Sequence, residues 1–115
     1  MYTKGPWTLL PQEDGVEYFR IRGTQLGGRY KVANVHFLKF NYAYEELHKR
    51  DLEESLANAR LISAAPELLE TLEIALNGLL WYQAMYPEHV CDSDYEAIAQ
   101  INNVIQKATG APTSV

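Results

Sequence analysis

The chain has 115 residues, of which 47% are hydrophobic and 22% are charged, a composition typical of one folded domain and not of a disordered segment. Its net charge of −5 argues against a protein that coats nucleic acid, because such domains are basic. A single cysteine, Cys91, excludes an internal disulfide framework and a multi-cysteine zinc site, and it suits a reducing compartment.

The longest apolar cluster, over residues 79–82, is far shorter than the ~20 residues that span a bilayer, and the first residues lack the pattern of a signal peptide. We therefore expect a cytoplasmic protein with no membrane partner.

The charge is unevenly spread along the chain. Residues 1–40 carry six basic and three acidic side chains, a net charge of +3, whereas residues 41–115 carry four basic and twelve acidic side chains, a net charge of −8. Such asymmetry is typical of a surface specialised for a partner of one sign.

The basic third of the chain predicts an antiparallel three-stranded β-meander. Its segments are rich in β-branched and aromatic residues and are separated by glycine-containing turns. We expect strands over residues 7–10, 16–22 and 29–37, with turns at 13–15 and 23–28.

Alternation along these strands predicts one core face and one polar face. Phe19 and Ile21 fall on the core face, while Arg20, Arg22 and Tyr30 fall on the polar face. The polar face also includes Tyr18, Asn34 and His36, and the alternation is imperfect around Lys31 and Val32.

The acidic two-thirds of the chain predicts about three helices. Residues 41–49 fit a helical turn or a linker, and a first full helix is expected from Asp51 or Leu52 to Ala64. Pro66 fits the first turn of a second helix, over residues 66–86, whose apolar stripe is wide. A third helix is expected from Asp92 or Ser93 to Gly110, with Glu96 in a capping box.

These elements predict the α+β class: an N-terminal antiparallel three-stranded β-meander packed on about three C-terminal helices. We expect a single domain over residues 1–110 and a disordered tail over residues 111–115. Because so few elements bury only a modest core, we expect homo-oligomerisation through the helix at 66–86.

No catalytic or metal constellation stands out. His36, His48 and His89 are scattered, without the ligand spacings of metal sites. The pair His89 and Cys91 is too uninformative in spacing to indicate a nucleophile and its base. The sequence therefore predicts no enzyme, no metal and no cofactor.

Two groups of residues are candidates for ligand binding. Arg20, Arg22 and Tyr30 have the chemistry to bind phosphates and stack a base, although an ordinary exposed sheet face has the same composition. Asn58 and Arg60 lie in an otherwise small, apolar helical stretch, where Asn58 can equally bond a strand backbone and Arg60 can pair with a nearby glutamate.

Two short segments resemble elements of small, mostly uncharacterised bacteriophage proteins. These are Gly5-Pro6-Trp7 and the run Asn58-Ala-Arg-Leu-Ile-Ser-Ala-Ala-Pro-Glu-Leu-Leu-Glu70. They also resemble the Gly-Pro-Trp and Asn-Ala-Arg elements of the Ead-type early proteins of lambdoid phages. The resemblance covers about twenty residues clearly, and the Tyr-rich stretch at 41–44 departs from it.

The resemblance implies a small phage accessory protein that antagonises a host defence. Its chemistry is compatible with the nucleotide sponges of the Thoeris anti-defence and anti-CBASS type, oligomers that sequester cyclic ADP-ribose isomers or cyclic oligonucleotides. On that interpretation the ligand-binding residues are Arg20, Arg22, Tyr30, Asn58 and Arg60, with no direct binding of nucleic acid.

The alternative is an acidic inhibitor, of the anti-restriction or anti-CRISPR type, that covers a basic site on a host enzyme. Its surface would be formed by glutamates of the first two helices. These are Glu45, Glu46, Glu53, Glu54, Glu67, Glu70 and Glu73.

Overall fold

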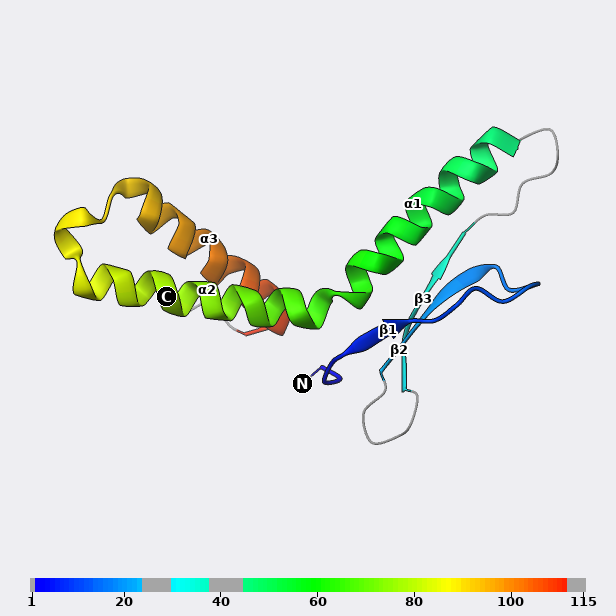
Figure 1. Cartoon of the computed structure of the whole chain (residues 1–115), viewed down its shortest axis with the longest axis horizontal. Helices are drawn as coiled ribbons and strands as arrows, with labels where there is room; N and C mark the ends of the chain where they lie inside the picture. Colours follow the sequence, from blue (N-terminus) through cyan, green and yellow to red (C-terminus); the bar gives the residue numbers. More distant parts are fainter. Residues whose placement is uncertain (1, 24–29, 38–44, 112–115) are drawn as a thin grey trace. The chain divides into compact units, whose positions relative to one another are not determined.

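A computed structural model describes residues 2–23, 30–37 and 45–111. The element order is β1 (Trp7–Leu9), β2 (Tyr18–Gly23), β3 (Tyr30–His36), α1 (Glu45–Ser63), α2 (Ala65–Met85), a 3-10 turn (Pro87–His89) and α3 (Asp92–Thr109) (Figure 1). The predicted α+β class is therefore confirmed. The predicted tail lies outside the described residues, apart from Ala111.

The contacts divide the chain into two compact units. The sheet unit spans Thr3–Glu67 and contains the three strands and α1. The hairpin unit begins at Leu68 and contains most of α2 together with α3, joined by Tyr2 from the N-terminus.

The strands form one antiparallel sheet in the order β1-β2-β3, as the meander pattern predicts. The turn between β1 and β2 is closed by the N–H of Val16, which donates to the carbonyl of Glu13 at 3.3 Å. The N–H of Leu10 donates to the carbonyl of Arg20 at 3.0 Å and extends the pairing one step beyond β1.

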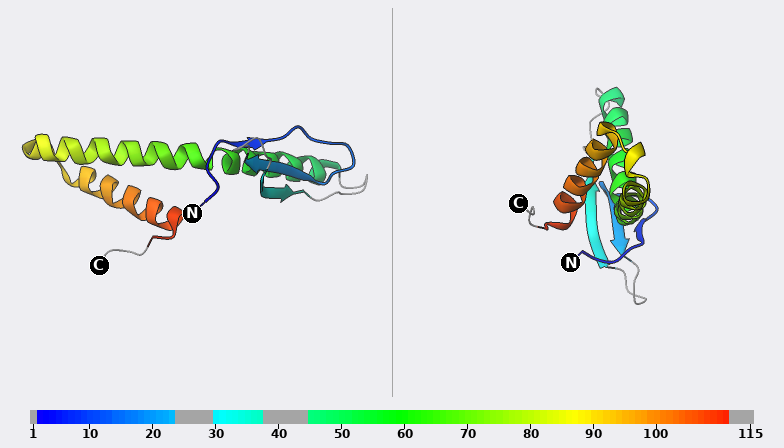
Figure 2. Two further views of the ribbon diagram at one scale, coloured as in Figure 1. Left: turned by 90° about the horizontal axis from the view of Figure 1, so that it is seen from below. Right: turned by 90° about the vertical axis from the view of Figure 1, so that its left-hand side faces the viewer.

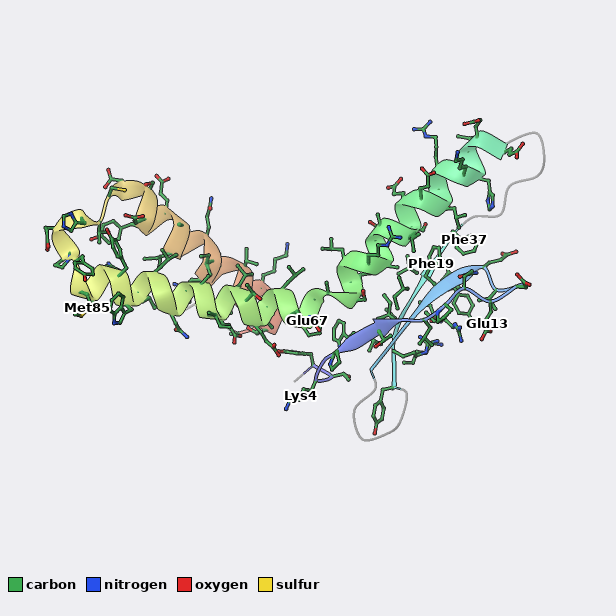
Figure 3. All side chains as sticks on the ribbon, viewed as in Figure 1. Lys4, Glu13, Phe19, Phe37, Glu67 and Met85 are labelled. Carbon is green, nitrogen blue, oxygen red and sulfur yellow. The ribbon has the colours of Figure 1, made fainter. Side chains whose placement is uncertain are left out.

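The core of the sheet unit lies between the sheet and α1. Phe19, Ile21 and Ala59 are buried, and Ile21 and Ala59 have no exposed surface. Figure 3 shows Phe19 and Phe37 between the strands and α1, with their ring centroids 5.2 Å apart. Alanine at position 59 leaves the room that the helix needs to approach the strands closely. The residues packed around this core are Trp7, Leu9, Val32, Ala33, Val35, Phe37, Leu52, Leu56 and Ile62.

The N-terminal segment packs against the start of α2 within the sheet unit. The indole N–H of Trp7 donates to the carbonyl of Thr3 at 2.8 Å. A Cβ placed on Gly5 would lie 2.8 Å from the Cβ of Pro66, which is itself buried. The two segments that resemble phage proteins therefore meet in space at Gly5 and Pro66.

Two predicted helix starts need correction. α1 begins at Glu45 and not at Asp51 or Leu52, since Glu45 and Glu46 stand four residues before Lys49 and Arg50, a spacing that supports a helical turn. The capping box of α3 is formed by Cys91 and Asp94 and not by Glu96.

The ends of the last two helices agree with the predicted signals. α2 carries Pro66 in its first turn, where a missing N–H costs nothing. α3 ends at Thr109 and is capped by Gly110, whose φ of 71° is the left-handed conformation that glycine adopts without strain.

Candidate binding face of the sheet

One face of the sheet packs on α1, and the other carries polar and cationic side chains. We call the second the outer face. Cross-strand partners share a face, so the register of the three strands defines its members. They are Thr8, Tyr18, Arg20, Arg22, Lys31, Asn34 and His36.

A β-bulge decides which residue of β3 lies beside Arg22. Ile21 pairs with Ala33, but Arg22 pairs with Lys31, so Val32 is the extra residue. Tyr30 consequently pairs with Gly23 and lies on the face that packs on α1, with its Cβ 3.9 Å from where a Cβ on Gly23 would be. The prediction that Tyr30 lies on the polar face is thus wrong, and Lys31 lies beside Arg22 on that face.

Arg22 is held in place by acceptors around this bulge. Its Nη1 donates to the carbonyl of Ala33 at 3.1 Å, to the carbonyl of Ile21 at 3.0 Å and to Oδ1 of Asn34 at 2.9 Å. A guanidinium fixed by three acceptors loses little conformational freedom when it binds an anion. The arrangement therefore stabilises the bulge and orients Arg22 on the outer face.

Arg20 is engaged by the loop between β1 and β2. Its Nη2 donates to the carbonyl of Pro11 at 3.0 Å, and its Nη1 lies 3.1 Å from Oε1 of Glu13. The Arg20 side chain is only 20% exposed, so these contacts account for much of its polar surface. Arg20 anchors the loop and contributes less free charge to the outer face than Arg22 or Lys31.

An aromatic pair lies at the other end of the outer face. The rings of Tyr18 and His36 are directly opposed across β2 and β3, with centroids 5.0 Å apart and planes inclined at 47°. His36 and Lys31 are exposed, whereas Tyr18 is half-buried. The outer face thus has a cationic end at Arg22 and Lys31 and an aromatic end at Tyr18 and His36.

The two candidates on α1 are placed on the other layer of the sheet unit. Asn58 and Arg60 are exposed on α1, which packs on the opposite face of the sheet, and two residues apart on a helix they do not face each other. The helix is instead tied to the sheet by the buried Ser55, whose hydroxyl donates to the carbonyl of His36 at 3.4 Å. Within the described parts of the chain, Arg60 forms no ion pair with a glutamate.

Of the five predicted ligand residues, the fold therefore brings together only Arg20 and Arg22. The sequence interpretation missed Lys31, although the imperfect alternation at Lys31 and Val32 was the trace of the bulge. It also missed Ser55, although that residue stands on the apolar stripe of α1 at the same spacing as its core neighbours.

A shallow cavity of about 140 Å³ lies elsewhere in the sheet unit and includes none of the five candidates. Drug-sized ligands occupy larger sites, of roughly 300–1,000 Å³. The cavity is lined by Gly15, Val16, Glu17, Phe37 and His48.

The cap at the start of α3 lowers the pKa of a carboxyl group, that of Asp94. The backbone N–H of Cys91 donates to Oδ2 of Asp94 at 3.0 Å, and the thiol of Cys91 donates to the same oxygen at 3.3 Å. Both bonds favour the carboxylate, so the pKa of Asp94 is lowered. In the described segments we find no group of three or more potential metal-ligating side chains, and no helix there is long and apolar enough to cross a membrane.

Comparison with known proteins identifies the family of the chain. No curated protein and no solved structure matches it. A family model described as Salmonella phage P22 protein Y8K6 matches residues 1–112, which confirms the resemblance to small phage proteins. The chain therefore belongs to the Salmonella phage P22 protein Y8K6 family.

Proposed function

We propose that this phage accessory protein is a non-enzymatic antagonist of a host defence system, which captures an anionic, nucleotide-type signal on the outer face of its sheet. The observation that carries the proposal is the placement of Arg22 directly across from Lys31, with the Tyr18–His36 pair further along the same face. Such a protein would act in the cytoplasm of the infected host.

The two ends of the outer face supply complementary interactions. The bonds that fix Arg22 all use Nη1, which leaves Nε and Nη2 to donate to a phosphate, and Lys31 adds a second positive charge. The aromatic rings of Tyr18 and His36 offer a surface on which a base can stack. Four residue steps along β2 separate the two ends by about 13 Å, a span that a dinucleotide-sized ligand covers.

Capture needs affinity alone, and the chemistry of the outer face supports such binding. Guanidinium, ammonium and aromatic groups bind phosphates and bases without breaking a bond. Sequestration also leaves the ligand chemically unchanged, which separates this proposal from an enzyme that degrades the signal.

The test is native mass spectrometry of the full chain, mixed with cyclic dinucleotides, cyclic trinucleotides and cyclic ADP-ribose isomers. We expect one of these to be retained with its mass unaltered. Lys31→Glu should weaken that affinity by roughly tenfold or more, because a carboxylate would then face the phosphate. Arg60→Glu is the matched control, since Arg60 is an exposed cation on the other layer and its reversal should change little.

Three results would contradict the proposal. Failure of every compound to bind would exclude nucleotide capture. Loss of ligand mass would indicate an enzyme. If Arg60→Glu strongly weakened ligand affinity and Lys31→Glu did not, the binding site would lie on α1.

A second candidate function is the acidic inhibitor. Its support is the exposure of four α1 glutamates, while Glu70 and Glu73 belong to the hairpin unit. Charge reversal by Glu53→Lys and Glu54→Lys should then abolish capture of a basic host protein from a lysate. Unchanged capture would exclude α1 as that surface. The remaining members of the exposed set are Glu45 and Glu46.

A further inference from the structure

The helices of the hairpin unit show a heptad pattern of apolar residues. Each helix has more apolar surface than its one neighbouring helix covers. Along α2, buried or half-buried side chains recur at alternating spacings of three and four residues, the a and d positions of a heptad. Figure 2 shows α3 running back antiparallel to α2 and diverging from it along its length. The positions on α2 are Leu69, Leu72, Leu76, Leu79 and Gln83.

The same pattern continues on α3. Its half-buried side chains at a and d are mainly isoleucines, and except for Leu69 every a and d side chain of the two helices is half-buried. Apart from Gln83 and Asp94, the seam between α2 and α3 is therefore apolar on both sides, and it is incompletely covered by its own two helices. The α3 positions are Asp94, Ile98, Ile101 and Ile105.

On each helix a third apolar stripe, at the g positions, runs beside the a and d positions. On α2 it includes Leu68 and Tyr82, which are 48% and 38% exposed, and on α3 it includes Val104, which is 50% exposed. In an antiparallel helix pair the g positions of both helices flank the same side of the seam. Apolar residues at a, d and g are typical of a helix with two neighbours in a bundle, whereas the hairpin gives each helix one.

The charges near this face indicate which partner covers it. Residues 74–86 and 97–106 contain no charged residue, in a chain whose net charge is −5. A two-fold interface packs the same patch of both copies together, so a patch carrying one sign of charge would repel itself, and these uncharged segments do not. Beside the g stripe, Gln100 at a c position carries an amide, which is both donor and acceptor and can therefore pair with an identical surface.

We infer that a second copy of this chain docks on the g side of the hairpin, so that two hairpins form a four-helix bundle. α2 is about 32 Å long and α3 about 27 Å. Each helix is about 10 Å wide, so the two helices together present a projected area of roughly 600 Å² on one side. A stable interface buries ~800 Å² of accessible surface on each partner, which is of similar size. This inference is independent of the ligand proposed for the outer face.

Sedimentation equilibrium of the full chain tests the inference. We expect a dimer at micromolar concentration. Val104→Lys should raise the dissociation constant on the order of 100-fold, because the two-fold axis brings two charges into an apolar interface. Tyr82→Lys should act in the same direction.

Ile74→Lys is the matched control. Ile74 is 71% exposed at an f position, opposite the seam, so the same charge placed there should leave the dimer intact. Circular dichroism of all variants should show unchanged helix content, since each replaced side chain is already exposed in one protomer. A wild-type monomer would overturn the inference, including one that captures a host protein instead. A dimer that survives Val104→Lys and Tyr82→Lys but is lost with Ile74→Lys would place the interface on the opposite side of α2.

Discussion

At the scale of single residues, Gly5 illustrates how a motif seen in sequence becomes a contact. Position 5 packs against the ring of Pro66, and a Cβ there would lie 2.8 Å from the proline Cβ and 3.2 Å from its Cγ. A proline ring on a helix has little freedom to move away. We expect Gly5→Ala to destabilise the protein by about 1–3 kcal/mol, the usual cost of overpacking.

Urea denaturation measures this effect, and Gly78→Ala is the control. Nothing lies within 4 Å of where a Cβ on Gly78 would be, and alanine is the better helix former, so this variant should gain up to about 1 kcal/mol. Equal stability of Gly5→Ala and the wild type would show that Pro66 and its surroundings give way to the new methyl group.

At the scale of elements, the start of α3 depends on an ionised side chain. Asp94 accepts hydrogen bonds from the backbone and the thiol of Cys91, and its pKa is lowered from 3.8. Its contribution to stability is therefore full above the pKa of the unfolded chain and is lost as the pH falls through the lower pKa of the folded protein. We expect Asp94→Asn to reduce stability at neutral pH, with a difference from the wild type that shrinks in acid.

Thermal unfolding of both proteins between pH 7 and pH 2 would follow that difference. Asp92→Asn serves as the comparison, because Asp92 also lies in the first turn of α3 but accepts no hydrogen bond from Cys91. A gap between Asp94→Asn and wild type that stays constant down to pH 2 would contradict the cap assignment.

The strands of the sheet show how much of the fold could be predicted from the sequence. The strands, their order and the core positions Phe19 and Ile21 follow from alternation, because a period of two is a property of every strand. The face of Tyr30 was predicted wrongly, because a bulge adds one residue and inverts the alternation between its two sides, and the imperfect alternation at Lys31 and Val32 did not say where the extra residue lies. The engagement of Arg20 by Glu13 likewise depends on how the loop folds back on β2.

The helix caps show the same limit for local signals. A capping box is normally recognised by serine or threonine at the first position, and here Cys91 occupies it. Asn58 was the conspicuous polar residue of its stretch, but the tie to the sheet comes from Ser55, which the helical period places toward the strands. Spacing was thus a better guide to contact than residue type.

At the scale of the whole molecule, the sheet unit and the hairpin unit differ in how they are stabilised. The sheet unit buries Phe19, Ile21 and Ala59 in a core of its own. In the described part of the hairpin unit, Leu69 is the buried hydrophobic side chain, while Trp81 and Met85 are among many that stay exposed. Helices of this length gain most of their stability from packing, so the hairpin should depend on its partner copy far more than the sheet does.

This difference predicts two thermal transitions, of which only the hairpin transition depends on protein concentration. A hundredfold increase in concentration stabilises a folded dimer by about 2.7 kcal/mol per mole of dimer, and it leaves an intramolecular core unaffected. Scanning calorimetry over that range should therefore move the hairpin transition upward while the sheet transition stays fixed. In Val104→Lys the hairpin transition should fall and lose its concentration dependence. A wild-type protein whose transitions are all independent of concentration would show that the two hairpin helices are stable without a second copy.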